Sequence, residues 1–133
     1  MSEFRILLPA DWPRPPGYSN GILANGPTVF LAGQIGWDAV TGRLAQGMAA
    51  QVEQALRNIV MLLAEADATP DDIVRLTWFV TDMEQYRQEG KAIGQGYRRV
   101  MGKHFPTMSV IGVSSLVERE ALVEIEATAV LRR

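Results

Sequence analysis

The chain has 133 residues, the length of one typical domain, so we expect a single domain spanning residues 1–133. Hydrophobic residues make up 47% and charged residues 21% of the chain, a composition typical of folded globular proteins that excludes extensive disorder. Thirteen basic and 15 acidic side chains give a net charge of −2 without any basic run, so we expect no nucleic-acid partner.

The N-terminal part of the chain contains a proline-rich segment followed by two short strand-like runs. Four prolines in residues 9–17 exclude a helix or a central strand and predict an extended lead-in on the surface, with ordered structure beginning after it. Residues 19–24 and 28–35 are rich in strand formers and flank Asn25-Gly26, a dipeptide typical of tight hairpin turns. These two runs are therefore predicted to form an antiparallel hairpin.

Two helices separated by a strand are predicted in the middle of the chain. Apolar residues recur at three- and four-residue spacing between Val52 and Ala66 and predict an amphipathic helix of about five turns. A β-branched and aromatic strand follows at residues 73–81, and a second helix at residues 83–104. Each glycine inside a helix costs about 1 kcal/mol relative to alanine. We therefore expect another element to approach the second helix closely at its three glycines, Gly90, Gly94 and Gly96.

Two more strands, at residues 107–113 and 121–131, complete the predicted order ββ(β)αβαββ. The odd positions of the last strand, from Val123 to Leu131, are all apolar, whereas its even positions mix carboxylates with apolar groups. In the strand at 73–81, one side is predicted to carry Val74, Leu76, Trp78 and Val80. We expect an α+β fold whose mixed sheet has two helices on one face, with a second subunit covering the other face.

The residue types present also limit metal, redox and membrane roles. The chain has no cysteine, so a metal site would depend on the single His104 and carboxylates, and we expect neither a metal nor a cofactor. No run approaches the roughly 18 apolar residues of a membrane span, and the apolar stretch near the N-terminus is too short for a signal-peptide core. We expect a cytoplasmic protein with no membrane partner.

Five segments, in their order and spacing, resemble the RidA/YjgF family, also called the endoribonuclease L-PSP family. They are residues 18–21, 31–35 (LAGQI), 73–77 (IVRLT), 105–106 (FP) and 123–127 (VEIEA). The resemblance covers nearly the whole chain. It implies a chorismate-mutase-like subunit, a homotrimer built around a central barrel, and small-molecule clefts between neighbouring subunits. Members of the best-known branch hydrolyse reactive enamines and imines to keto acids and ammonia.

The same resemblance implies which residues form the cleft. In the deaminases an arginine two residues after the Phe-Pro pair holds the substrate carboxylate, and Met108 occupies that position here. A thioether cannot make the charge-assisted hydrogen bonds of a guanidinium, so a simple carboxylate ligand loses its anchor. Val110 stands where many deaminases have cysteine, and Gly94 lies near a position often held by asparagine. Both changes make the predicted cleft more apolar.

On the other side of the predicted cleft, Glu124 aligns with the family carboxylate that positions a water molecule or transfers protons. Tyr18, Ala32 and Gly33 fall at pocket positions of the family, Tyr18 as an aromatic wall and Gly33 as a backbone N–H donor. Trp37 follows the Gly33 strand and either stacks on a ligand or closes a subunit contact.

Other polar residues favour structural roles over catalytic ones. Glu126 shares a strand face with Glu124, but such i, i+2 carboxylates mostly face solvent or an interface. His104, near the end of the second helix, is more typical of a C-terminal cap than of a general base. Ser114 and Ser115 lack the context of a nucleophile.

Two functions are consistent with the sequence. One is a RidA-like homotrimer that hydrolyses an imine or enamine, using Glu124 and a held water, on a ligand less acidic or more apolar than a simple 2-imino acid. The other is a non-catalytic sensor or scavenger of the same fold, in which Tyr18, Met108 and Val110 line a binding pocket. Three arginines are candidates to replace the cation missing at Met108: Arg14, Arg75 and Arg119.

Overall fold

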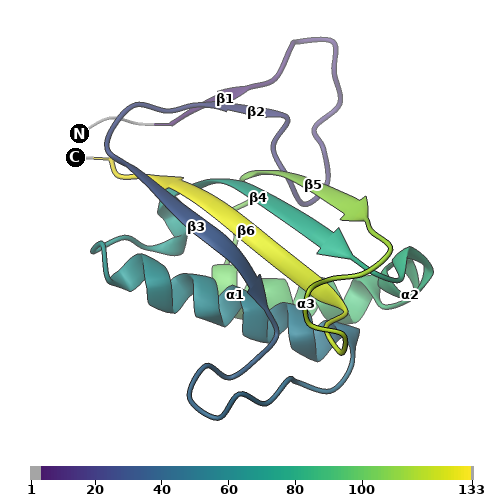
Figure 1. The fold of residues 1–133 in the computed structure, drawn as a ribbon. Coiled ribbons are helices and arrows are strands. Elements are labelled where there is room, and N and C mark those ends of the chain that lie inside the picture. The colour runs from purple at the N-terminus through teal and green to yellow at the C-terminus, as the bar shows by residue number, and fades with distance from the viewer. Residues whose placement is uncertain (1–3, 133) are drawn as a thin grey trace.

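The computed structural model describes residues 4–132 and contains a four-stranded mixed sheet and a two-stranded ribbon (Figure 1). The strand order of the main sheet is β3-β6-β4-β5. β6 is antiparallel to both of its neighbours, whereas β4 and β5 are parallel. The strands of this sheet are β3 (Thr28–Ile35), β4 (Ile73–Val80), β5 (Thr107–Gly112) and β6 (Val123–Val130).

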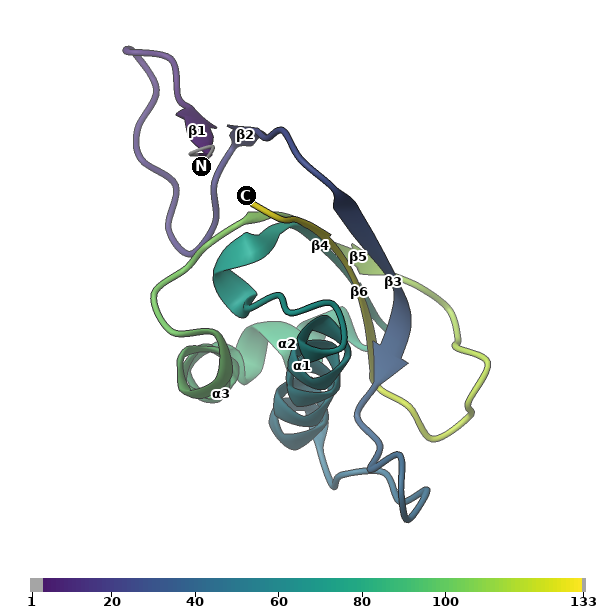
Figure 2. The same cartoon turned by 90° about the vertical axis from the view of Figure 1, so that its left-hand side faces the viewer.

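Two main helices, α1 (Met48–Ala64) and α3 (Gly90–Met101), cover one face of this sheet and leave the other face open (Figure 2). The apolar stripe of α1 packs into the core, where each fully buried aliphatic side chain contributes roughly 1.5–3 kcal/mol. Its fully buried members are Met48, Val52, Ala55, Leu56, Ile59 and Leu63. The structure confirms the predicted α+β class, with two helices on one face of a mixed sheet.

Successive side chains of the central strands point to opposite faces of the sheet, and this alternation decides which residues face the helices. In β6, Val123, Ile125, Ala127 and Ala129 are buried, as predicted. In β4, Leu76, Trp78 and Val80 are buried as predicted. Val74 is not, because a register shift between Ile73 and Arg75 interrupts pairing with β6. Such a bulge reverses the inward and outward sides, so Ile73 is fully buried in place of Val74.

The predicted hairpin around Asn25-Gly26 is wrong. The short strand β2 (Gly21–Leu23) pairs with β1 (Arg5–Leu7), whereas β3 pairs with β6. Gly26 does adopt a positive φ of 148°, but it lies against the Leu131 carbonyl, and the chain passes there from the ribbon to the main sheet. Val29 and Leu31 of β3 are partly buried against the core when β3 joins β6, and a three-residue strand could not provide this packing.

The expectation that ordered structure begins after the proline-rich segment is also wrong, because β1 precedes it. The prolines occupy the loop between β1 and β2, which together form an arm above the main sheet (Figure 1). Proline lacks the N–H that a strand ladder requires, so the segment is confined to this connection, while the residues before it remain free to pair.

The second predicted helix is divided into α2 (Met83–Gln88) and α3, with Glu89 between them. Asp82 caps α2 by accepting a hydrogen bond from the Gln85 N–H. The expected close approach is confirmed at Gly96, where a β-carbon would stand 3.1 Å from Glu53 Oε1 on α1. It is wrong at Gly90 and Gly94, which have no atom within 4 Å of a β-carbon position.

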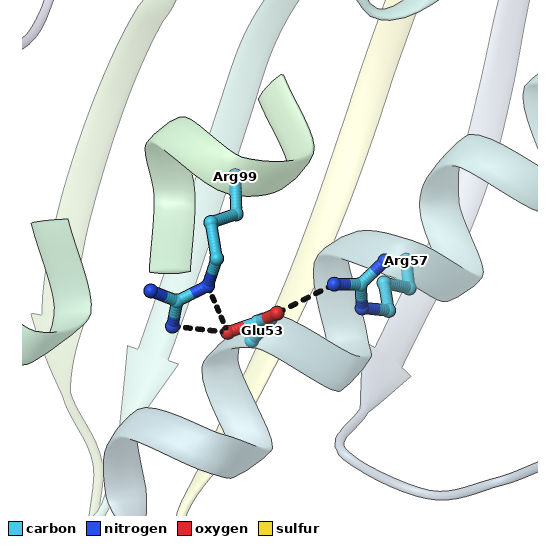
Figure 3. A network of polar contacts seen from close by, with 3 residues as sticks. All are labelled: Glu53, Arg57 and Arg99. Atoms are coloured by element: carbon cyan, nitrogen blue, oxygen red, sulfur yellow. Dashed lines mark hydrogen bonds and ion pairs between the residues drawn. The ribbon is translucent and has the colours of Figure 1, made fainter. Parts of the chain in front are cut away.

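An ionic network joins α1 to α3 (Figure 3). Arg99 Nη2 lies 2.6 Å from Glu53 Oε1, and Arg57 Nη2 lies 2.6 Å from Glu53 Oε2. Hydrogen bonds from Arg99 and then from Arg57 hold the pKa of Glu53 below its ordinary value of 4.5. The network therefore fastens the two helices to each other at neutral pH.

The open face of the main sheet is only partly polar. Phe30 and Ile111 are 78% and 43% exposed there, beside Glu126 and the threonines of β4 and β6. Phe30 pairs with Thr128 and Ile111 pairs with Phe79, which places these residues on the side away from the helices. Within residues 4–132, no helix is both long enough and apolar enough to cross a membrane.

Candidate functional site

The first part of the candidate site is formed where β3 and β6 lose their regular register between Leu31 and Gln34. At this irregularity Gly33 lies beneath the side chain of Glu124, and a β-carbon at position 33 would stand 2.6 Å from the Glu124 carboxyl carbon. Glycine is therefore needed here to leave space for the carboxylate. The sequence motif and the fold thus bring two of the predicted residues together.

A cavity of about 330 Å³ lies beside this pair, and we call it the Glu124 pocket. Its lining consists of Gly33, Gln34, Ile35, Trp37, Val117, Glu118 and Glu124. Glu124 is half-buried, and its carboxylate has no hydrogen-bond or ion-pair partner among residues 4–132. A carboxylate in this setting can hold a water molecule or accept a proton.

Two buried polar residues of α1 hold the walls of the Glu124 pocket, and sequence reasoning missed both. Asn58 Nδ2 donates to the carbonyl oxygens of Ile35 at 3.2 Å and Trp37 at 2.8 Å. Gln51 Oε1 accepts from the Leu122 N–H at 2.8 Å, just before β6 begins. The available signal was the occurrence of amide side chains within the apolar stripe of a predicted helix.

The second part of the candidate site is a cavity of about 160 Å³ on the helix-covered side of the sheet edge, which we call the Met108 pocket. It is lined by Gly17, Trp78, Tyr86, Gly90, Ile93, Gly94, Tyr97, Arg98, Phe105 and Met108. The ring of Tyr97 stacks on Phe105 with centroids 5.7 Å apart and on Trp78 with centroids 6.4 Å apart. The pocket is therefore walled mainly by rigid aromatic rings.

Polar atoms around the Met108 pocket are mostly neutral. Burial raises the pKa of Tyr97 and of Tyr86 above the ordinary value for a phenol. The Tyr97 hydroxyl donates to the His104 carbonyl oxygen at 2.6 Å. Trp78 Nε1 is the one buried side-chain nitrogen or oxygen in residues 4–132 without a hydrogen-bond partner. The ring of Trp78 instead meets that of Tyr86 edge-on, with centroids 6.3 Å apart.

Within one chain, Glu124 and Met108 lie on opposite faces of the sheet. Met108 is in register with Leu76, which faces the helices, whereas Glu124 is in register with Phe79 on the open side. Gly94 lies in the Met108 pocket and Trp37 in the Glu124 pocket. One chain therefore carries two separate pockets, one on each face of the sheet.

Three predicted site residues lie outside both pockets. Tyr18 lines a cavity of about 540 Å³ beneath the N-terminal arm, together with Arg14 and His104. Val110 is partly buried against the core beside Trp78, and Ala32 is exposed on β3.

The polar residues for which structural roles were expected lie as follows. His104 Nε2 lies 2.7 Å from the Ile73 carbonyl oxygen and donates to it, so the ring holds the start of β4. Glu126 is exposed on the open face, and Ser114 and Ser115 are exposed in the loop after β5. Among residues 4–132, no three histidine or carboxylate side chains gather in a way that could hold a metal ion.

None of the three arginines proposed from the sequence lines the Met108 pocket. Arg14 lines the cavity beneath the arm, Arg75 lines a fourth cavity beside β2, and Arg119 is exposed in the loop before β6. Arg98 of α3 does line the pocket, and sequence reasoning missed it. The signal was present, because Arg98 follows Gly94 by four residues and so shares its helix face.

Comparisons with known proteins agree with this fold. The family described as Endoribonuclease L-PSP matches residues 13–131. A "RutC family protein" from Aquifex aeolicus is 34% identical over 113 residues, covering 85% of this chain and 87% of that protein. A 2-iminobutanoate/2-iminopropanoate deaminase from Salmonella typhimurium is 33% identical over 110 residues, covering 80% and 82%.

A solved structure is similar over almost the whole length of both chains. It is YyfB from Yersinia pestis, a protein of unknown function of the Rid family, with a TM-score of 0.83 and 36% identity over 96% of this chain and 98% of that one. The sequence match and the structural match thus cover the segments that form the Glu124 pocket and the Met108 pocket. The chain belongs to the endoribonuclease L-PSP family, which is the RidA/YjgF family that its sequence resembles.

Proposed function

We propose that three copies of this chain assemble into a homotrimer in which the Glu124 pocket of one subunit adjoins the Met108 pocket of its neighbour. The observation that supports this arrangement is the location of Glu124 and Met108 on opposite faces of the sheet. Exposed Phe30 and Ile111 on the open face also favour burial by another subunit. Each cleft then contains one carboxylate and one aromatic pocket.

The proposed reaction in this cleft is hydrolysis of a carbon–nitrogen double bond. Glu124 accepts a proton from a held water molecule as the water oxygen bonds to the imine carbon, and the imine nitrogen takes up a proton. The proton that the imine nitrogen takes up comes from solvent and gives a carbinolamine. Glu124 then returns its proton to that nitrogen, the carbon–nitrogen bond breaks to release ammonia, and the hydroxyl proton passes to solvent as the carbonyl forms. An enamine substrate first takes a proton on carbon to become the imine. Relatives named 2-iminobutanoate/2-iminopropanoate deaminase support this reaction class.

The proposed substrate differs from the simple 2-imino acids of those relatives. Met108 provides a thioether where a carboxylate-binding guanidinium would make two charge-assisted hydrogen bonds. The aromatic side chains around Met108 favour a larger apolar group instead. A second function, binding without hydrolysis, is favoured by the same apolar lining and requires no action by Glu124.

The test is to generate imino acids in place with an amino-acid oxidase and to measure the rate of ammonia release with and without the protein. We expect acceleration for imines with apolar side chains and loss of that acceleration in Glu124→Gln, which keeps the size of the side chain and removes its charge. Glu126→Gln is the matched control, because Glu126 is exposed on the same strand face. If Glu124→Gln is as active as the natural protein, the hydrolytic proposal is wrong; if no imine is hydrolysed at all, binding without hydrolysis takes its place.

A further inference from the structure

Arg98 has an unusual environment for a helix arginine of this protein. It lines the Met108 pocket and is exposed, and its guanidinium has no hydrogen-bond or ion-pair partner among residues 4–132. Its neighbour Arg99, by contrast, makes two hydrogen bonds to Glu53. Arg98 therefore offers its whole guanidinium to whatever occupies the pocket.

The charge of Arg98 is not compensated by the pocket lining. No aspartate or glutamate contributes to that lining, and the two tyrosines in it are neutral. A guanidinium has a planar set of N–H donors that fits the two oxygens of a carboxylate. A single unpaired guanidinium at an apolar pocket thus favours a monoanionic ligand over a neutral or multiply charged one.

The size and walls of the pocket indicate what the rest of this ligand is. A volume of about 160 Å³ is close to that of a dry cavity that accepts one benzene molecule. The walls are the rings of Trp78, Tyr86, Tyr97 and Phe105 together with the flexible thioether of Met108. Sulfur and ring edges both pack favourably against an aromatic group.

We propose that the Met108 pocket binds a small monocarboxylate that bears one ring-sized apolar group, with that group between the aromatic walls and the carboxylate on Arg98. This inference rests on the proposed function in placing the substrate in this pocket. In this arrangement the carboxylate is anchored by Arg98 on α3 and not by a residue at position 108 on β5. The carboxylate is then held at the exposed end of the pocket, so the accepted acids are larger than those anchored at position 108.

Binding of non-hydrolysable probes tests this inference without any need for catalysis. The probes are 3-phenylpropanoate, its neutral amide 3-phenylpropanamide, and propanoate, each titrated into the full-length protein by calorimetry. We expect 3-phenylpropanoate to bind at least about tenfold more tightly than the amide, the factor that one charge-assisted hydrogen bond supplies. Propanoate lacks the ring and should bind more weakly by a similar factor or more. Equal affinity for acid and amide, or no binding by either, overturns the proposal.

Two variants assign the effect to Arg98. Arg98→Met should remove the preference for acid over amide, while Lys91→Met, which removes one charge from the same helix outside the pocket, should keep it. Adding Met108→Arg to Arg98→Met should restore the preference, because it returns a guanidinium to the same pocket. An unchanged preference in Arg98→Met contradicts the proposal. If the probes bind tightly in a way that depends on Arg98 but the protein hydrolyses no imine in the oxidase-coupled assay, only the proposed hydrolysis is contradicted.

Discussion

The carboxylate of Glu124 on β6 lies directly over the α-carbon of Gly33 on β3. The two residues meet where the register between these strands is irregular, and the absence of a side chain at position 33 leaves the space that the carboxylate occupies. The position of the proposed catalytic group is therefore set by a glycine on the neighbouring strand.

Gly33→Ala is predicted to impair hydrolysis much more than folding. The new β-carbon overlaps the Glu124 side chain, which can turn toward solvent at little cost in stability but then misplaces its carboxylate. A displacement of about 1 Å can lower turnover about a hundredfold. Gly112→Ala is the control, because its β-carbon would make only an ordinary contact of 3.6 Å with Met83. Steady-state rates with both variants check the prediction, and equal rates would contradict it.

Met108→Arg is predicted to shift the preference of the protein toward small 2-imino acids. The guanidinium adds charge-assisted hydrogen bonds to a carboxylate, and one such bond gives at least about a tenfold gain in kcat/KM for 2-iminopropanoate. Met108→Leu keeps an apolar side chain and should give no gain. Comparison of the two variants in the oxidase-coupled assay checks this. If the natural protein already hydrolyses 2-iminopropanoate as fast as Met108→Arg does, an arginine at position 108 is not needed.

Asn58→Leu is predicted to lower the free energy of unfolding. The substitution keeps the shape of the side chain but removes the donors to the Ile35 and Trp37 carbonyl oxygens. A buried polar group left without its partner costs about 1–3 kcal/mol. Urea unfolding measures the change, with Met61→Gln as a control because Met61 is 56% exposed on the same helix. An Asn58→Leu protein as stable as the natural one would show that these hydrogen bonds contribute nothing net.

The network of Glu53 predicts a dependence of stability on pH. Since the pKa of Glu53 is lower in the folded state than its ordinary value, its contribution to stability is present above pH 4.5 and is lost as the pH falls through the folded-state pKa. Glu53→Gln should therefore be less stable than the natural protein at pH 7 and no less stable at acidic pH. Unfolding curves from pH 7 down to about pH 2.5 test this. Glu84→Gln, which breaks an exposed pair with Arg87, should change little at either pH.

Patterns that depend on one element at a time could be predicted from the sequence. The apolar odd positions of β6 place the correct residues in the core. The three- and four-residue spacing in α1 does so too, except at Leu62, which is 39% exposed, and together the two patterns define the α+β fold. The Gly33 and Glu124 motifs predict two residues that the structure does bring together.

Features that depend on competition between elements could not be predicted in the same way. Asn25-Gly26 is a valid local turn signal, but β3 gains more by pairing with the long strand β6 than with a three-residue neighbour. The bulge that buries Ile73 in place of Val74 depends on the register with β6, which no residue of β4 encodes alone. The hydrogen bonds of Asn58 and the access of Arg98 to the Met108 pocket likewise depend on tertiary geometry.

Subunit complementation tests most directly the central claim, that the two half-sites of each cleft, the Glu124 pocket and the Met108 pocket, belong to neighbouring subunits. Glu124→Gln inactivates one half-site, and Gly94→Phe fills the other, because no atom lies within 4 Å of a β-carbon at position 94. Each variant alone should be inactive and trimeric by light scattering. Mixed trimers formed from equal amounts should recover roughly a quarter of the natural activity, since that share of interfaces joins two intact half-sites. Mixed trimers that stay inactive would contradict a cleft shared between subunits.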